Sequence, residues 1–176
     1  EISSLLEEYM RGALLLSGLQ EQHEEVKTLI REAKRLVFLG NGGSMSTCSH
    51  MAHDFLKVGK IKTLCPESAN LITCLANDYG VENMWDEWLA IQLQLEDLIV
   101  VVSSSGNSLN LVNATKACKE HGFKVVTITG FDPSNKLNQL GDVNVHIATN
   151  NFGCHEQYSG VFLHSILDDL VKENNA

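Results

Sequence analysis

The feature that most constrains the fold is the stretch 98–121, which has the pattern of a strand, a hydroxyl-rich turn and a helix. Residues 98–102, Leu-Ile-Val-Val-Val, form a continuous apolar run rich in β-branched side chains. Such a run is typical of a strand buried on both faces of a parallel sheet. The turn at 103–108 reads Ser-Ser-Ser-Gly-Asn-Ser, and residues 109–121 have helical spacing. The stretch therefore predicts an α/β fold.

The turn at 103–108 also indicates a site for a phosphate group. Serine and asparagine side chains cap helices, and the free N–H groups at the positive end of a helix bind anions. An ordinary capped turn explains any single serine here, but four in six residues favour a phosphate site with neutral donors.

A second turn of the same kind follows an earlier strand, at residues 35–39. It reads Gly-Asn-Gly-Gly-Ser at 40–44 and precedes a predicted helix over 45–58. Ligands of open parallel sheets lie outside the carboxyl ends of the strands, near the point where the strand order reverses. We therefore expect both turns to face one ligand. The sequence has neither G-x-G-x-x-G spacing after this strand nor G-x-x-x-x-G-K-[ST], which disfavours nicotinamide cofactors and nucleoside triphosphates.

The rest of the chain predicts one domain with a helical arm. Residues 3–33 have helical spacing, as two helices or one helix bent near Gly18, and we divide the chain into an oligomerisation arm at 1–34 and a domain at 35–176. The arm covers either the sheet of its own chain or another subunit. We expect residues 61–69 to be irregular, 71–75 to be a short strand or helix start, 76–80 to be a turn and 143–147 to be an edge strand. Strands alternating with helices predict a parallel sheet flanked by helices on both faces.

Composition limits the possible partners. The formal charge is −9, from 13 basic and 22 acidic residues, so we expect no binding to nucleic acid or to anionic membranes. The five cysteines are odd in number and contain no C-x-x-C pair, which predicts reduced thiols in a cytoplasmic protein. No apolar run has transmembrane length, and the first four residues do not have the pattern of a signal peptide.

Two predicted helices carry residues that suit a metal. His50 and Asp54 are four positions apart and share one helix face, although such a pair is more often a surface hydrogen bond. In the predicted helix 156–172, Gln157 and His164 lie within about 20° of each other and Glu156 about 80° away, at 100° per residue. Spacing alone therefore favours Gln157 over Glu156, and a histidine in this apolar stretch is more often a core residue.

Several features of the sequence together resemble the SIS (sugar isomerase) domain family. They are the two turns, His50 with an acid four residues later, Asn77-Asp78 and the helix of His164. The resemblance runs over nearly the whole chain in the same order and is strongest to the phosphoheptose isomerase branch. It implies one Zn²⁺ per subunit and a homotetramer with sites at subunit boundaries. It implies sugar-phosphate contacts at Asn41, Gly42, Gly43, Ser44, Asn77, Asp78, Ser103, Ser104, Ser105, Ser108 and Glu156, and zinc ligands at His50, Asp54, Glu156 and His164.

The chain departs from the family pattern at three places. Asp54 replaces the usual Glu, Glu156 replaces the usual Gln and has Gln157 beside it, and Gly153-Cys154 replaces Asp-Arg. An extra carboxylate suits a dication.

The resemblance implies an aldose–ketose isomerase that acts on a phosphorylated sugar, sedoheptulose 7-phosphate, through a metal-assisted enediol. We expect Asp54 to be the base and His164 its acid–base partner, whereas the neighbouring His53 is turned about 100° from their face. The alternatives are an isomerase for another phosphosugar and a non-catalytic SIS protein of the type that associates with replication initiators.

Overall fold

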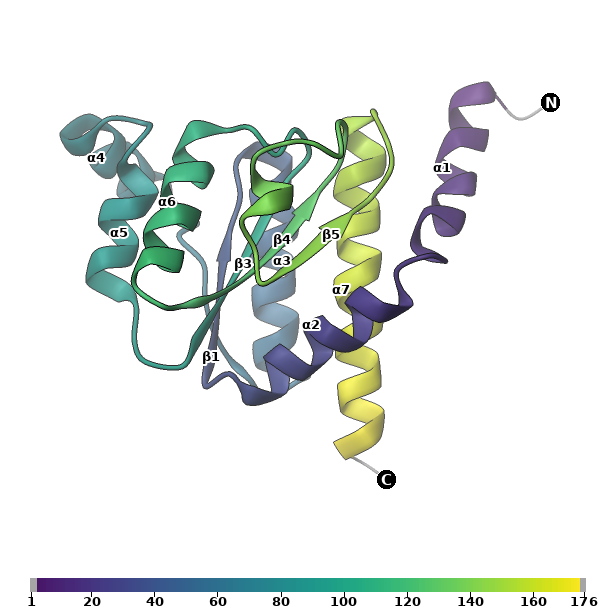
Figure 1. Ribbon diagram of the computed structural model, residues 1–176, viewed down its shortest axis with the longest axis horizontal. Helices are drawn as coiled ribbons and strands as arrows, with labels where there is room; N and C mark the ends of the chain where they lie inside the picture. Colours follow the sequence, from purple (N-terminus) through teal and green to yellow (C-terminus); the bar gives the residue numbers. More distant parts are fainter. Residues whose placement is uncertain (1–2, 175–176) are drawn as a thin grey trace.

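The structure, a computed structural model, describes residues 3–174 and contains a five-stranded sheet in the order β2-β1-β3-β4-β5 (Figure 1). Every neighbouring pair is parallel. The strands are β1 (Arg35–Leu39), β2 (Lys62–Leu64), β3 (Asp97–Ser103), β4 (Lys124–Thr129) and β5 (Val143–His146). The helices are α1 (Ser4–Leu16), α2 (Gln20–Glu32), α3 (Gly42–Lys57), α4 (Ala69–Tyr79), α5 (Met84–Gln92), α6 (Leu109–Glu120), the 3-10 turn η1 (Leu137–Gln139) and α7 (Phe152–Asn174).

The sheet separates two apolar layers, which confirms the predicted α/β architecture. In β3, Leu98, Val100 and Val102 face the layer formed by α2, α3 and α7. Ile99 and Val101 face the layer formed by α4, α5 and α6. All seven residues of β3 are buried, as the continuous apolar run predicted.

The strand order reverses between β1 and β3. The chain runs from β1 outward to β2 at one edge, then returns to β3 on the other side of β1. Leu39 pairs with Val101, so β1 and β3 end at the same edge of the sheet. The turns after these two strands therefore open side by side, which confirms the expectation drawn from their sequences.

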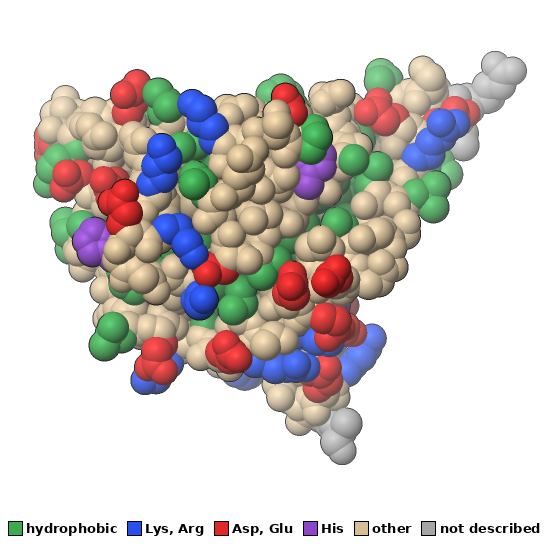
Figure 2. Space-filling model, in the orientation of Figure 1, with side chains coloured by type: hydrophobic (Ala, Val, Ile, Leu, Met, Phe, Trp, Pro, Cys, Tyr) green, Lys and Arg blue, Asp and Glu red, His purple; other side chains and the backbone are tan. Residues whose placement is uncertain are grey.

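The two N-terminal helices are placed differently. Helix α2 covers the sheet of its own chain, with Val26 and Ile30 buried in the core. Helix α1 projects from the body and meets the start of α7, where the Tyr158 hydroxyl donates to the Tyr9 carbonyl (Figure 1). Apolar side chains on the projecting helix stay exposed, as Figure 2 shows at the right of the view; these are Leu5, Leu6, Met10 and Leu14.

Two local expectations are wrong. Residues 62–64, which we expected to be irregular, form β2. They do so because they pair with the open edge of β1, and a three-residue segment does not show by itself that such a partner exists. Residues 69–79 form the continuous helix α4, so the expected turn at 76–80 is absent from this segment. The Ser68 hydroxyl caps α4 by accepting from the Leu71 amide at 3.4 Å, and Gly80, with φ of +79°, ends it.

The described helices, within residues 3–174, include none with both the length and the apolar composition needed to cross a bilayer.

Candidate active site

A cavity of about 270 Å³ lies at the carboxyl edge of β1 and β3. It is lined by both predicted turns together with the first residues of α7. The predicted sugar-phosphate contacts that line it are Asn41, Gly42, Gly43, Ser44, Ser103, Ser104, Ser105, Ser108 and Glu156, and Val102 and Phe152 complete the wall.

The serine turn is held by its own backbone, which leaves hydroxyl protons available. Ser103 Oγ accepts from the Gly106 amide at 3.2 Å, and Ser105 Oγ accepts from the Asn107 amide at 3.3 Å. Both hydroxyls remain free to donate to a ligand. Ser108 is the N-cap residue of α6, but its side chain makes no capping hydrogen bond. The serines therefore offer neutral donors at the cavity.

The glycine turn brings the backbone of α3 close to α7. Gly42 has φ of +53°, a conformation that glycine adopts without strain. A Cβ added to Gly43 would lie 2.1 Å from Glu156 Oε1, so glycine is needed for this close approach. The Asn41 amide is already engaged: it exchanges hydrogen bonds of 2.9 and 3.0 Å with Asn110 and accepts from Trp85 Nε1 at 3.2 Å.

Three helices, α3, α6 and α7, begin at the cavity. The first N–H groups of a helix have no partner within it and carry the positive end of the helix dipole. No lysine or arginine is among the cavity-lining residues in the described part of the chain. The site thus suits an anion held by amides and hydroxyls.

A cluster of titratable side chains lies further along α3 and α7. Asp54 Oδ2 of α3 is 3.0 Å from His50 Nε2 and 3.0 Å from His164 Nε2 of α7. The two imidazole rings are 5.2 Å apart in an edge-to-face arrangement. The side chains are 29% (Asp54), 40% (His164) and 65% (His50) exposed, so the cluster opens to the surface of the protomer.

The hydrogen bonding of His164 makes this cluster suitable for a cation. Its Nδ1 is 2.9 Å from the Gly160 carbonyl, which can only accept, so Nδ1 carries a proton. Its Nε2 then faces a carboxylate oxygen, and that contact requires either a second proton or a cation between the two atoms. Metal-binding histidines commonly have this backbone partner on the other ring nitrogen.

Glu156 lies apart from this cluster. His50, Asp54 and His164 offer ligand atoms within 4.8 Å of one another, and Glu156 is not part of that group. Its carboxylate lies against Gly43 in the cavity, two helical turns from His164. Gln157, which spacing alone favoured, is exposed.

Other predicted residues lie outside both regions. Asn77 and Asp78 are exposed on α4, hydrogen-bonded to each other, and do not line the cavity. Their contact with substrate stays a prediction. His53 is exposed and lies 3.5 Å from Glu67, away from the cluster of His50, Asp54 and His164.

His155 lies beside the cavity, although no sequence pattern indicated it. This residue is fully buried, and its Nδ1 lies 3.0 Å from Ser104 Oγ. Burial lowers the pKa of the imidazole to about 4; the Thr129 carbonyl acts in the opposite direction, and His146 adds a smaller lowering. No local pattern indicates this contact, because Ser104 and His155 are 51 positions apart.

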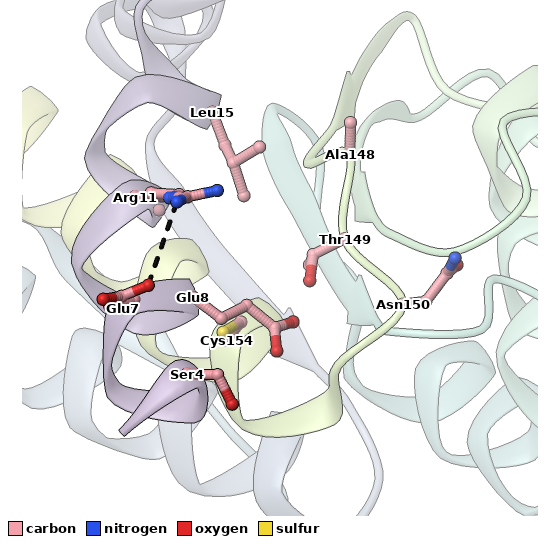
Figure 3. A pocket seen from close by; sticks show the side chains of 10 residues that line it. Ser4, Glu7, Glu8, Arg11, Leu15, Ala148, Thr149, Asn150 and Cys154 are labelled. Carbon is pink, nitrogen blue, oxygen red and sulfur yellow. Dashed lines mark ion pairs between the residues drawn. The ribbon is translucent and has the colours of Figure 1, made fainter. Parts of the chain in front are cut away.

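A larger cavity, of about 450 Å³, lies between α1 and the segment after β5 (Figure 3). Glu8 of α1 points toward Thr149 across it, and Arg11 pairs with Glu7 at 3.9 Å. Neither turn of the candidate site contributes to this cavity, so its size is not a reason to place the chemistry there.

Comparison with known proteins identifies the family. The family model described as SIS domain matches residues 13–130. The chain belongs to the SIS-domain family. The phosphoheptose isomerase of Aliarcobacter butzleri is 26% identical to this SIS-domain protein over 187 aligned residues, which cover 97% of each chain. That of Histophilus somni is 30% identical over 144 residues, which cover 78% of this chain and 67% of the relative.

The fold of this SIS-domain protein is also that of a solved structure. Phosphoheptose isomerase GmhA from Neisseria gonorrhoeae superimposes with a TM-score of 0.86 at 22% identity, over 95% of each chain. At this identity the likeness establishes the fold.

Proposed function

We propose that this SIS-domain protein is an aldose–ketose isomerase that converts sedoheptulose 7-phosphate to glycero-manno-heptose 7-phosphate. The observation that carries the proposal is one pair of helices, α3 and α7, joining an anion-binding cavity to a cluster of two histidines and a carboxylate. The relatives named phosphoheptose isomerase support an enzyme that isomerises phosphosugars. Among phosphosugars, we propose the heptose as the substrate.

The phosphate of the sugar binds at the serine and glycine turns. Helix N-termini and hydroxyls supply its hydrogen bonds, and the absence of lysine and arginine among the described lining residues allows the product to dissociate. Asn77 and Asp78 would have to reach the sugar from outside the cavity walls.

The distance between the two regions favours a long sugar. Gly43 and His50 are seven residues apart on α3, about 10 Å along the helix axis at 1.5 Å per residue. A ligand with phosphate at one end and a reactive carbonyl at the other must bridge this span. A seven-carbon chain suits it better than a triose.

Asp54 is the base. Its Oδ2 faces the two histidines, so Oδ1 is the oxygen available to take the proton from carbon 1 of the ketose. Removal of this proton gives the enediol, and return of a proton to carbon 2 gives the aldose. His164 would move the proton between the two sugar oxygens through Nε2, since its Nδ1 is held by the Gly160 carbonyl; this role requires that Nε2 is not a metal ligand during the transfer.

His50, Asp54 and His164 would hold one Zn²⁺ per subunit. The pairing of Nε2 of His164 with a carboxylate, described above, supports a cation here, and imidazole and carboxylate are ligands that zinc prefers. Zinc, when bound, would polarise the carbonyl of the sugar. Glu156, the fourth ligand implied by the family resemblance, lies near Gly43, so it contacts the sugar in this arrangement.

We also propose that the protein works as a homotetramer in the cytoplasm. The exposed apolar face of α1 and the open side of the histidine cluster support association between subunits, because a proton-transfer site needs protection from water. All five cysteines are free thiols, in keeping with a reducing compartment. Light scattering on a size-exclusion column tests the tetramer, and elution as a monomer contradicts it.

The test of the function is conversion of sedoheptulose 7-phosphate in deuterated water, with and without zinc, together with the metal content of protein purified without added metal. We expect product, deuterium at the exchanged carbon and about one zinc per chain. Deuterium exchange without net product means another phosphosugar is the substrate. No exchange, no metal and an intact tetramer would favour a non-catalytic SIS protein.

A further inference from the structure

Phe152 is an aromatic side chain in the wall of a cavity that is lined mostly by polar groups. It lines the cavity together with both turns and is 61% exposed. Val102, the other large apolar residue among the described lining residues, is 0% exposed. Phe152 therefore supplies the apolar surface that a ligand can cover, and a phosphate group, which has no apolar atoms, gives this ring no role.

The first turn of α7 fixes the backbone of Phe152. The preceding residue, Asn151, caps the helix, because its Oδ1 accepts from the Cys154 amide at 3.1 Å. The following residue is Gly153, where an added Cβ would lie 2.1 Å from the Tyr9 hydroxyl oxygen. The backbone on this side thus packs closely against α1. Phe152 belongs to a segment that is held on both sides.

A second aromatic side chain, Phe131, holds the ring itself. The two ring centroids lie 4.7 Å apart at an angle of 70°, which is an edge-to-face contact. Phe131 has φ of +57°, a conformation that is rare for a bulky side chain. Its amide donates to the Thr149 carbonyl at 2.8 Å, which keeps the turn in this conformation. An aromatic residue at a strained backbone position indicates that its ring contact has a function.

The turn of Phe131 is tied to the serines of the cavity. Gly130, which precedes Phe131, donates its amide to the Ser104 carbonyl at 3.0 Å. Ser104 belongs to the serine turn and lines the cavity. The two rings and the hydroxyl donors therefore keep a fixed spacing. Because Phe152 and the serines share one cavity of about 270 Å³, the carbon atoms next to a bound phosphate lie within reach of the ring.

We propose that Phe152 is a specificity-determining residue that packs against the C–H groups next to the phosphate of the ligand, with Phe131 holding its ring in place. The inference rests on the proposed function in taking the ligand to be a phosphorylated sugar. The C–H face of a sugar chain is apolar and covers an aromatic ring, whereas inorganic phosphate cannot. The site thereby distinguishes a phosphate ester of a sugar from free phosphate.

The test compares the affinities for inorganic phosphate and for sorbitol 6-phosphate by calorimetry. Sorbitol 6-phosphate has a carbon chain but no carbonyl, so its binding requires no turnover. Covering one face of a phenyl ring corresponds to about a five- to tenfold change in affinity. Phe152→Ala should weaken the binding of sorbitol 6-phosphate by that factor and leave the binding of inorganic phosphate unchanged. Phe152→Tyr keeps the ring and should bind both ligands like the unmodified protein.

Two further variants separate the ring contact from folding. Phe131→Asn removes the second ring but suits a positive φ, so the fold should stay intact while sorbitol 6-phosphate binds about threefold more weakly. Val161→Ala is the matched control, because Val161 lies on the same helix, is 49% exposed and lies outside the cavity. It should leave both affinities unchanged.

The kinetic readout uses sedoheptulose 7-phosphate. Phe152→Ala should raise KM and leave kcat nearly unchanged, since the ring contacts the substrate in both the ground state and the transition state. A fall in kcat at constant KM would contradict a role in specificity.

The outcomes distinguish this inference from the proposed function. Weaker binding of sorbitol 6-phosphate alone in Phe152→Ala, in a protein that does not isomerise the heptose, would uphold the specificity role and remove the substrate. Equal losses for both ligands, or no loss for either, would overturn the specificity role while the isomerase stands. A smaller assembly of Phe152→Ala on a size-exclusion column would also overturn it, because another subunit would then cover the ring. Absence of binding of either ligand to the unmodified protein would overturn both.

Discussion

The polar groups at the two ends of the β1–β3 strand pair differ in their hydrogen bonding: those at the amino end are paired within the chain, and those at the carboxyl end line a cavity. At the amino end, Arg35 pairs with Asp97 through two hydrogen bonds of 3.0 and 2.6 Å. The Arg35 guanidinium also donates to the Gln92 carbonyl at 2.7 Å, and Asp97 accepts from the Gln94 amide at 2.8 Å. At the carboxyl end, Asn41 and Ser103, each six residues further along the chain, line an open cavity with the other polar groups of the two turns.

This difference shows how one pair of strands provides both stability and binding. At the amino end the charged groups are satisfied within the chain, and the Asp97 side chain is 1% exposed. At the carboxyl end, helix N-termini and hydroxyls keep donors that only a ligand can satisfy. We therefore expect substitutions at the amino end to lower stability and substitutions on the carboxyl side to lower binding or turnover.

The largest expected effect is on turnover, in Asp54→Asn. Loss of a positioned base lowers kcat by about a hundred- to ten-thousandfold. Phosphate affinity and the midpoint of thermal unfolding should change little, because Asp54 lies outside the cavity. His53→Gln, a neighbouring exposed change on α3, is the control and should retain full turnover. An active Asp54→Asn would remove Asp54 as the base.

The next largest effect is on stability, in Asp97→Ala. Removing one partner of a buried ion pair costs about 3–5 kcal/mol of unfolding free energy, since Arg35 stays in place without its carboxylate. Urea unfolding measures this loss. Phosphate affinity should remain unchanged at a temperature where the variant is folded; a weaker affinity there would mean that the two ends of the strands are coupled.

Gly106→Ala should lower both stability and phosphate affinity. Gly106 has φ of +61°, and an added Cβ would lie 1.8 Å from Asn135 Oδ1. Strain and displacement of Asn135 should lower the unfolding free energy by about 2 kcal/mol. Because Gly106 lies inside the serine turn, phosphate affinity should fall in parallel. Unfolding curves and calorimetry on the same sample measure both, and a stable variant with normal affinity would show that the turn tolerates the change.

The smallest effects come from two serines at helix N-termini, Ser108 and Ser68, that we expect to behave differently. Ser108→Ala should weaken phosphate binding about tenfold and leave stability nearly unchanged, since its side chain makes no capping hydrogen bond to α6. Ser68→Ala should cost about 1 kcal/mol of stability and leave phosphate affinity unchanged, since Ser68 does cap α4. The reverse pattern would contradict the distinction between binding and capping serines.

Much of the fold followed from local patterns. The apolar run of β3, the two Gly/Ser turns and the alternation of strands with helices predicted a parallel sheet with ligand groups at its carboxyl edge. These features are local: side-chain type and spacing along a few residues determine them. Local patterns failed at β2, where a three-residue strand forms only because β1 has an open edge, and at residues 76–79, where α4 continues through a polar segment.

The sequence by itself determined which segments carry polar turns and which helices carry His50, Asp54 and His164. Only the tertiary structure decided which side chains meet. Helical spacing favoured Gln157, yet Glu156 faces the cavity because α3 approaches α7 closely at Gly43. His155 reaches Ser104 only because the start of α7 packs beneath the serine turn. The physical reason is that contacts between distant segments depend on strand order and helix packing, which no short stretch of sequence encodes.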